Sequence, residues 1–223
     1  YHLQSCHGGR GVLMARTVGA SPAKVVVIGH GNAGGAAAQL AAAMGAEVTV
    51  FGTRQTGLRR FQALMPSNVT CHVNERETFQ RAVLQADVVV GAILISTHDT
   101  PALIDDELVR RMKKGAVIID VTCGYGAGYL PTFDRLTTHD RPCYEHHGIL
   151  HCKIDAMPAS VPLTAAEAMT SNVTPYLVRL AQDVLGGESD TTSRSGIITK
   201  AGEIVHPEVL RHIELAKDNK VTA

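Results

Sequence analysis

The chain has no tryptophan, few other aromatic residues, no net charge and no long apolar run. Aromatic residues make up 4% of its 223 residues, and 21 basic residues balance 21 acidic ones. This balance gives no electrostatic basis for binding nucleic acid or an anionic membrane surface, so we predict neither partner. No apolar stretch reaches the roughly 18 residues that a membrane-spanning helix needs, and no signal peptide is visible. We therefore expect a cytoplasmic protein without a membrane span.

The five cysteines are odd in number and irregularly spaced, which favours reduced thiols over a disulfide framework. The densest group of potential metal ligands is Cys143, His146, His147, His151 and Cys152. Alternation along a strand expected there would send His151 and Cys152 to opposite faces. No paired C-x2-C or H-x3-H spacing supports a zinc site, so we predict no metal.

The most informative segment is an apolar strand that runs into a glycine-rich turn and then into an alanine-rich helix. The turn has the spacing Gly29-x-Gly31-x-x-Gly34. In a dinucleotide-binding βαβ unit the first glycine allows the tight turn, the second lets the backbone approach a pyrophosphate, and the third lets helix and strand pack. The helix start, at Asn32 and Ala33, then offers its amides to the phosphates. The alternative is a glycine-rich turn that binds nothing.

Strand-like and helical segments alternate along the chain, which predicts an α/β fold. Continuously apolar strands are typical of a parallel sheet buried on both faces. We predict a doubly wound, mainly parallel Rossmann-type sheet of about six strands, with 25–29 at its centre. The expected strands are 25–29, 47–51, 70–73, 87–91, 117–121 and 149–154. The expected helices are 33–43, 57–64, 75–84, 105–112, 164–169 and 174–185.

Helix-end signals support the C-terminal part of this assignment. Thr164 and Glu167 have the spacing of a capping box, Thr174 followed by Pro175 predicts a helix start, and Gly186 suits a helix stop. Polar residues at 186–194 read as a linker, 197–205 as a hairpin, and the residues after 207 as a short helix.

We expect three parts along the chain. They are an interlobe helix end with a glycine-rich crossing at 1–22, a dinucleotide-binding domain at 23–172, and a C-terminal helix and helical appendage of a second lobe at 173–223. The first residue is Tyr1 rather than methionine, so we expect a chain that is trimmed, processed or partly given.

Several segments, in order, resemble the alanine dehydrogenase and proton-translocating transhydrogenase family. They are GGRGVLM at 8–14, PAKVVVIG at 22–29, ADVVVGAILI at 86–95, KGAVIIDV at 114–121, MPASVP at 157–162 and TSNVTPYL at 170–177. The resemblance covers residues 1–182. It implies a bilobal, homo-oligomeric enzyme that acts on a small amino or keto acid. It also implies that the substrate lobe, with its substrate-binding Arg and Lys and its catalytic His, precedes this chain or belongs to a partner chain.

One departure from the family concerns the cofactor. The family usually has an acidic residue at the end of the second strand, where it binds the adenosine ribose of NAD. Here that position is Gly52, and it is followed by Thr53 and Arg54. Losing the carboxylate and gaining a hydroxyl and a guanidinium suits a 2′-phosphate, so we predict that NADP(H) is preferred. Arg59 and Arg60 could assist. The alternative is that Arg54 is a solvated loop charge and that NAD(H) binds.

A second departure concerns the chemistry. Gly124 stands where an alanine dehydrogenase carries a catalytic Asp beside the nicotinamide. Before Met157, where alanine dehydrogenases typically read Ala-Asn, this chain reads Asp155-Ala156. An Asp there resembles the saccharopine dehydrogenase and carboxyethyl-ornithine synthase branch, which reduces imines. Asp155 is therefore a candidate to orient an amine or bind ribose, and its alternative role is to cap the loop before Pro158.

The loops at the carboxyl ends of the parallel strands complete the expected cofactor site. Besides the residues named above, they are Ile93, Leu94, Val121, Thr122, Cys123, Gly124, Ile154, Asp155, Ala156 and Met157. His151 is the acid/base candidate of this region, and a hydrogen-bonded structural histidine is the alternative.

The leading hypothesis is an NADP(H)-dependent oxidoreductase that reductively aminates a 2-oxo acid or reduces an imine, together with a lobe outside this chain. One alternative is a catalytically silent nucleotide-binding or regulatory subunit. The other is a fragment of an ordinary NAD-dependent alanine dehydrogenase.

Overall fold

The structure is a computed structural model that describes residues 1–93, 101–122, 129–186 and 191–221. It divides into two compact units, Tyr1–Met157 and Pro158–Ala223, which are described separately. The division falls before the expected boundary at 172, because one continuous helix spans that boundary.

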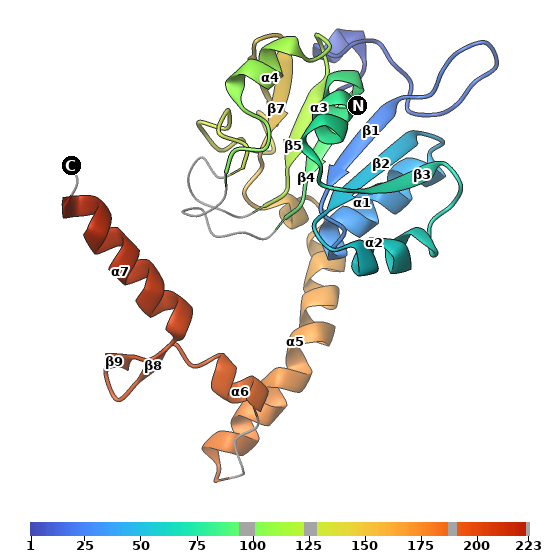
Figure 1. The fold of residues 1–223 in the computed structure, drawn as a ribbon. Coiled ribbons are helices and arrows are strands. Elements are labelled where there is room, and N and C mark those ends of the chain that lie inside the picture. Colours follow the sequence, from blue (N-terminus) through green and yellow to red (C-terminus); the bar gives the residue numbers. More distant parts are fainter. Residues whose placement is uncertain (94–100, 123–128, 187–190, 222–223) are drawn as a thin grey trace. The chain divides into compact units, whose positions relative to one another are not determined.

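The first unit is built on a seven-stranded sheet in the order β3-β2-β1-β4-β5-β7-β6. Figure 1 labels β1 to β5 and β7 of this sheet. Its strands are β1 (Lys24–Ile28), β2 (Glu47–Gly52), β3 (Val69–Val73), β4 (Val88–Gly91), β5 (Val117–Asp120), β6 (Tyr144–His146) and β7 (Ile149–Cys152). All neighbouring pairs are parallel except β6 with β7. The predicted mainly parallel, doubly wound sheet is confirmed. The sequence analysis missed β6, a three-residue edge strand.

Alternating side chains of β1 divide the core into two layers. Val26 and Ile28 join a cluster that includes Phe79 and Leu108. Val25 and Val27 face the opposite side of the sheet, in the cluster that contains Ala38, Ala41 and Ala42. Both faces of the strand are thus buried, which explains its continuously apolar sequence. The helices of this unit are α1 (Asn32–Ala43), α2 (Gln55–Gln62), α3 (Arg76–Gln85) and α4 (Asp106–Arg111).

The N-terminal segment packs against the sheet and belongs to the first unit. Where a helix end was expected, the structure has only a 3-10 turn, Ser5–His7. Arg10 Nε lies 3.1 Å from the buried Asp87 carboxylate, which also binds Lys113 Nζ at 3.2 Å and accepts a hydrogen bond from the Lys24 amide. These contacts join residues 1–22 to the sheet, whereas the sequence analysis had placed them in a part separate from residues 23–172.

The second unit contains α5 (Pro162–Val184), α6 (Thr191–Ser195), the two-stranded β8 (Thr199–Lys200) and β9 (Glu203–Ile204), and α7 (Pro207–Val221). The expected helices 164–169 and 174–185 form the single helix α5, with Pro175 in its interior. The two helix-start assignments were wrong. Thr174 Oγ1 donates to the Thr170 carbonyl within the helix at 2.7 Å, and the residue before the helix, Val161, provides no side-chain cap.

The expected hairpin and final helix are both present, with Thr199 paired to Ile204. Among the residues that the structure describes, no helix combines the length and apolarity needed to cross a bilayer.

Candidate functional site

The three glycines of the turn after β1 have different surroundings. Gly29 has a φ of 99°, and a Cβ there would lie 2.6 Å from the Ala92 carbonyl oxygen. A Cβ at Gly34 would overlap the carbonyl oxygen of Gly29, so helix and strand touch at this point. At Gly31, by contrast, a Cβ would meet nothing within 4 Å. Internal packing therefore accounts for the first and third glycines, and the second leaves open backbone facing a pocket.

This pocket has a volume of about 570 Å³ and lies at the carboxyl ends of β1, β2 and β4. The strand order reverses between β1 and β4, which is where dinucleotides bind in doubly wound sheets. The lining residues are Ile28, Gly29, His30, Gly31, Asn32, Ala33, Phe51, Gly52, Thr53, Asn74, Ala92, Ile93 and Leu103. Gly31 directly precedes α1, so the first amides of the helix are at the pocket. The residues and the open backbone fit a dinucleotide phosphate.

The structure brings six of the predicted cofactor residues together around this pocket, namely Gly29, Gly31, Asn32, Ala33, Thr53 and Ile93. Gly34 supports the turn from inside the fold. Leu94, Cys123 and Gly124 lie outside the described residues. His30, Asn74 and Leu103 also line the pocket and were not predicted from the sequence. The position of His30 between the first two glycines could have indicated it.

His30 occupies the space beside Gly52, the position where the family usually has an acidic residue. A Cβ at Gly52 would lie 2.7 Å from His30 Nδ1, and a Cβ at Gly57 would lie 2.9 Å from His30 Nε2. The His30 ring also contacts the Phe61 ring, with a centroid separation of 5.8 Å. A side chain at Gly52 is therefore excluded unless the His30 ring moves.

Thr53 and Arg54 follow Gly52 and are both exposed. Arg54 is the residue before α2, so its backbone adjoins the amides that begin this helix. Its guanidinium forms no ion pair with any residue that the structure describes, and it is available for an anion. A cationic side chain next to a helix N-terminus is a favourable setting for a phosphate.

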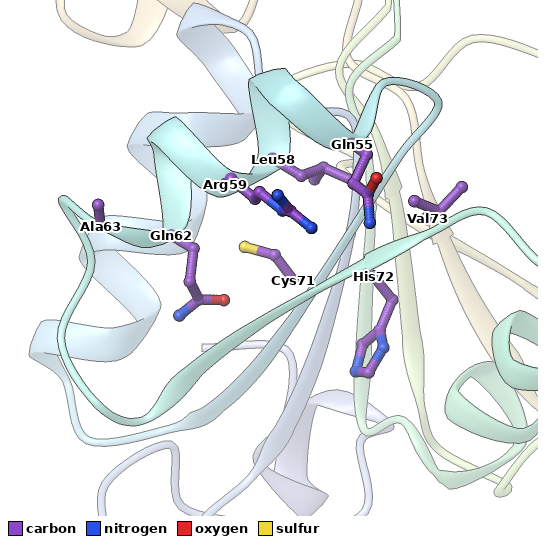
Figure 2. A pocket seen from close by; sticks show the side chains of 8 residues that line it. All are labelled: Gln55, Leu58, Arg59, Gln62, Ala63, Cys71, His72 and Val73. Atoms are coloured by element: carbon purple, nitrogen blue, oxygen red, sulfur yellow. The ribbon is translucent and has the colours of Figure 1, made fainter.

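A second pocket, of about 430 Å³, lies between α2 and β3 (Figure 2). The Arg59 side chain extends into it above Cys71 and beside Gln62. Arg59 does not line the pocket at Gly31. The suggested help from Arg59 with a 2′-phosphate therefore has no support from the position of its side chain.

A buried ion pair lies where β5 and β7 end. Asp120 Oδ2 is 2.7 Å from Lys153 Nζ, and the two side chains are 3% and 9% exposed. Thr122 donates its amide and hydroxyl to Asp120 Oδ1, and the Tyr129 hydroxyl lies 3.4 Å from the same atom. Burial, followed by the Asp120 charge, raises the pKa of Tyr129 well above its usual range. This network holds Val121 and Thr122 directly after β5, where the Val121 amide also donates to the Gly91 carbonyl.

The structure supports the structural alternative for His151. Its side chain is fully buried, its Nε2 lies 2.9 Å from Thr132 Oγ1, and its Nδ1 lies 3.0 Å from the Ile149 carbonyl oxygen. Burial lowers its pKa. Both ring nitrogens are thus occupied within the core, and the ring does not reach the pocket lining.

Asp155 lies in the exposed turn after Ile154, which bridges to Thr137, and Ala156 accepts a hydrogen bond from His139. Asp155 has no hydrogen-bond or ion-pair partner in the described parts of the chain, so it does not cap the loop before Pro158. Met157 begins the following 3-10 turn. Among the described residues, the Asp155 carboxylate is therefore unpaired, at the carboxyl ends of the strands.

Comparison with known proteins agrees with this geometry. The family model of the alanine dehydrogenase/PNT C-terminal domain matches residues 1–207. The chain belongs to this family. The resemblance described from its sequence motifs is thereby confirmed.

Two alanine dehydrogenases illustrate the relationship. That of Bacillus subtilis (strain 168) is 34% identical over 213 residues, which are 95% of this chain and 56% of that protein. That of Mycolicibacterium smegmatis (strain ATCC 700084 / mc(2)155) is 36% identical over 217 residues, 96% of this chain and 58% of that protein.

Among solved structures, an L-alanine dehydrogenase matches with a TM-score of 0.83 and 35% identity, covering 94% of this chain and 58% of the other. The transhydrogenase from Sinorhizobium meliloti has a TM-score of 0.66 at 17% identity, with 93% of this chain and 58% of the other covered, and supports the fold alone. This member of the alanine dehydrogenase/PNT C-terminal family thus spans 56–58% of the length of these relatives.

Proposed function

We propose that this chain is the nucleotide-binding part of an NADP(H)-dependent oxidoreductase that acts on the C–N bond of an amino acid or imino acid. Membership of the family and the pocket at Gly31 support nucleotide binding. The observation that carries the cofactor preference is the exclusion of a side chain at Gly52 by the His30 ring.

A carboxylate at the Gly52 position would accept hydrogen bonds from the ribose hydroxyls of NAD(H) and repel the 2′-phosphate of NADP(H). In this chain the position has no side chain, and Thr53, Arg54 and the start of α2 follow it. His30 adds an imidazole ring, which carries no negative charge. All of these groups favour an anion at the adenosine ribose.

The remaining chemistry depends on the carboxyl edge of the sheet. A bound nicotinamide dinucleotide supplies the hydride that reduces the substrate carbon. We propose that the free Asp155 carboxylate accepts a hydrogen bond from the substrate amine or from a ribose hydroxyl. The buried Lys153–Asp120 pair holds the Asp155 turn against the segment after β5 and acts as a positioning element.

Substrate selection belongs to the part of such enzymes that this chain does not span. We propose that a second lobe provides a cation for the substrate carboxylate and an acid/base group, because reduction of an α-imine requires both. The substrate class is therefore an amino, imino or 2-oxo acid, which enters as a small molecule.

The test is to assay residues 1–223 with pyruvate, ammonia and either NADPH or NADH, beside the full product of the same gene. We expect the isolated chain to bind NADPH without forming alanine, because proximity and a positioned acid/base contribute many orders of magnitude to the rate. Turnover by the full gene product with NADPH would support the proposal. Robust alanine formation by residues 1–223 alone would overturn the assignment of substrate chemistry to a second lobe. Nucleotide binding without turnover by the full product would favour a silent subunit.

A further inference from the structure

Two histidines and an aspartate that are distant in sequence converge at one edge of the first unit. His146 ends β6, His147 lies in the turn before β7, and Asp106 begins α4. His146 Nε2 lies 2.7 Å from Asp106 Oδ1, and His147 Nε2 lies 2.8 Å from the same oxygen. The three potential ligand atoms all lie within 4.8 Å of one another.

The backbone at His147 makes this convergence possible. Neighbouring residues of a strand point to opposite faces, so His146 and His147 would diverge in a regular hairpin. His147 instead has a φ of 53° and is followed by Gly148 at 73°. Left-handed conformations are uncommon for residues other than glycine, and among these Asn, Asp and His adopt them more often than the rest. This turn brings the two rings to one side, with centroids 4.1 Å apart.

Neighbouring side chains hold the cluster in place. Arg110 Nε binds Asp106 Oδ2 at 2.8 Å, which leaves Oδ1 directed at the histidines. Lys114 Nζ donates to the His147 carbonyl at 2.7 Å and so holds the turn. The side chains of His146, His147 and Asp106 are 35%, 24% and 47% exposed, so an ion can reach them from solvent.

We infer that Asp106, His146 and His147 form a structural binding site for a divalent transition-metal ion of the zinc class. Two imidazole nitrogens and one carboxylate oxygen suit Zn²⁺ and Co²⁺, with water completing the coordination, whereas Mg²⁺ and Ca²⁺ prefer oxygen ligands alone. Ligand atoms of a tetrahedral Zn²⁺ site lie about 3.3 Å apart. The two histidine nitrogens lie 2.7 and 2.8 Å from Asp106 Oδ1, so each needs to move only about 0.5 Å away from that oxygen. On binding, the ion replaces the two hydrogen bonds to Asp106 Oδ1. Each ring then coordinates through an unprotonated Nε2 as a neutral imidazole with its one proton on Nδ1, and any further proton is released to solvent.

The position in the fold indicates a bracing role rather than a catalytic one. The His147–Gly148 turn precedes β7, while Gly29 follows β1, and these strands run parallel through β4 and β5. The metal site is thus at the amino ends of the parallel strands, whereas the nucleotide pocket is at their carboxyl ends. It joins α4 to the antiparallel edge hairpin β6–β7.

The experiment uses the tag-free chain after treatment with a chelator. Zn²⁺ is titrated by calorimetry, and Co²⁺ by the visible absorption that imidazole coordination produces. His147→Asn removes one ligand with a residue that accepts the left-handed conformation, and His72→Asn is the matched control on β3. We expect one Zn²⁺ per chain, at least about tenfold weaker binding in His147→Asn and in Asp106→Asn, and unchanged binding in His72→Asn.

Thermal unfolding provides a second measurement. An ion that binds only the folded state raises Tm, so we expect Zn²⁺ to raise it by several degrees in the parent and in His72→Asn but not in His147→Asn. Equimolar Mg²⁺ should have no effect. Absence of stoichiometric Zn²⁺ binding in the parent, or its retention by both Asp106→Asn and His147→Asn, would overturn the assignment.

Discussion

Replacing Gly52 tests whether the space beside the adenosine ribose is arranged for a 2′-phosphate. In Gly52→Asp a carboxylate enters next to that phosphate and repels it. Two unit charges about 4 Å apart interact by about 4 kcal/mol at an effective dielectric constant of 20, and exposure reduces this value. We expect NADPH binding to weaken by about 2–4 kcal/mol, which is roughly 30- to 1,000-fold in Kd.

The same substitution has a packing cost, because its Cβ would lie 2.7 Å from His30 Nδ1. Gly52→Ala is the matched control, since it adds the Cβ without the charge. It should lower the free energy of unfolding by about 1–3 kcal/mol while keeping the preference for NADPH. Gly52→Asp combined with His30→Ala should regain stability and bind NADH better than either single variant.

Fluorescence titration with NADPH and NADH, beside thermal unfolding, measures both effects. An unchanged ratio of NADPH to NADH affinity in Gly52→Asp would refute the electrostatic reasoning. An unchanged Tm in Gly52→Ala would refute the packing of His30 on this glycine.

Four further variants test separate parts of the structure. Arg54→Ala should weaken NADPH binding by about 1.5–3 kcal/mol and leave NADH binding nearly unchanged. Arg59→Ala, the control on the same helix whose side chain lines the second pocket, should change neither titration. Gly31→Asp should abolish binding of both nucleotides while circular dichroism shows a retained fold, because its Cβ meets nothing within 4 Å; retained binding would place the nucleotide elsewhere. Lys153→Met should cost about 3–5 kcal/mol in urea unfolding, because it leaves a buried carboxylate unpaired, and a loss below 1 kcal/mol would contradict that pairing. Burial lowers the pKa of His151, so the folded state disfavours its protonation and the free energy of unfolding should fall as pH drops below about 6.5. In His151→Gln the free energy of unfolding should depend less on pH in this range. The same pH dependence in the variant and the parent would contradict the burial argument.

Most strands of the sheet could be predicted from the sequence because each has a distinctive local pattern of apolar residues. Val25–Ile28 and Val88–Gly91 are apolar on both faces, and the glycine spacing after the first of them marks the turn toward a helix. The edge strand β6 was missed because Tyr144–His146 is short and polar. The helix start predicted at Thr174 was wrong because α5 begins at Pro162 and continues through Pro175. A threonine followed by proline is typical of a helix start, so the local sequence alone indicated one there.

The site was predictable only where one contiguous segment forms it. Gly29 and Gly31 were predicted from a motif of known spacing, and Thr53 from the departure from the family pattern at Gly52; all three line the pocket. The packing of His30 on Gly52 and the meeting of Asp106 with His146 join residues more than twenty positions apart. Such pairs depend on strand order and turn conformation, which no local pattern encodes.

The most direct test of the central claim is a comparison of NADPH and NADH binding by the unmodified chain. Both Kd values are measured by calorimetry under the same salt conditions, because interactions with a phosphate are screened by salt. We expect NADPH to bind at least about tenfold more tightly than NADH, which corresponds to about 1.4 kcal/mol from the 2′-phosphate. Equal affinities, or tighter binding of NADH, would contradict it.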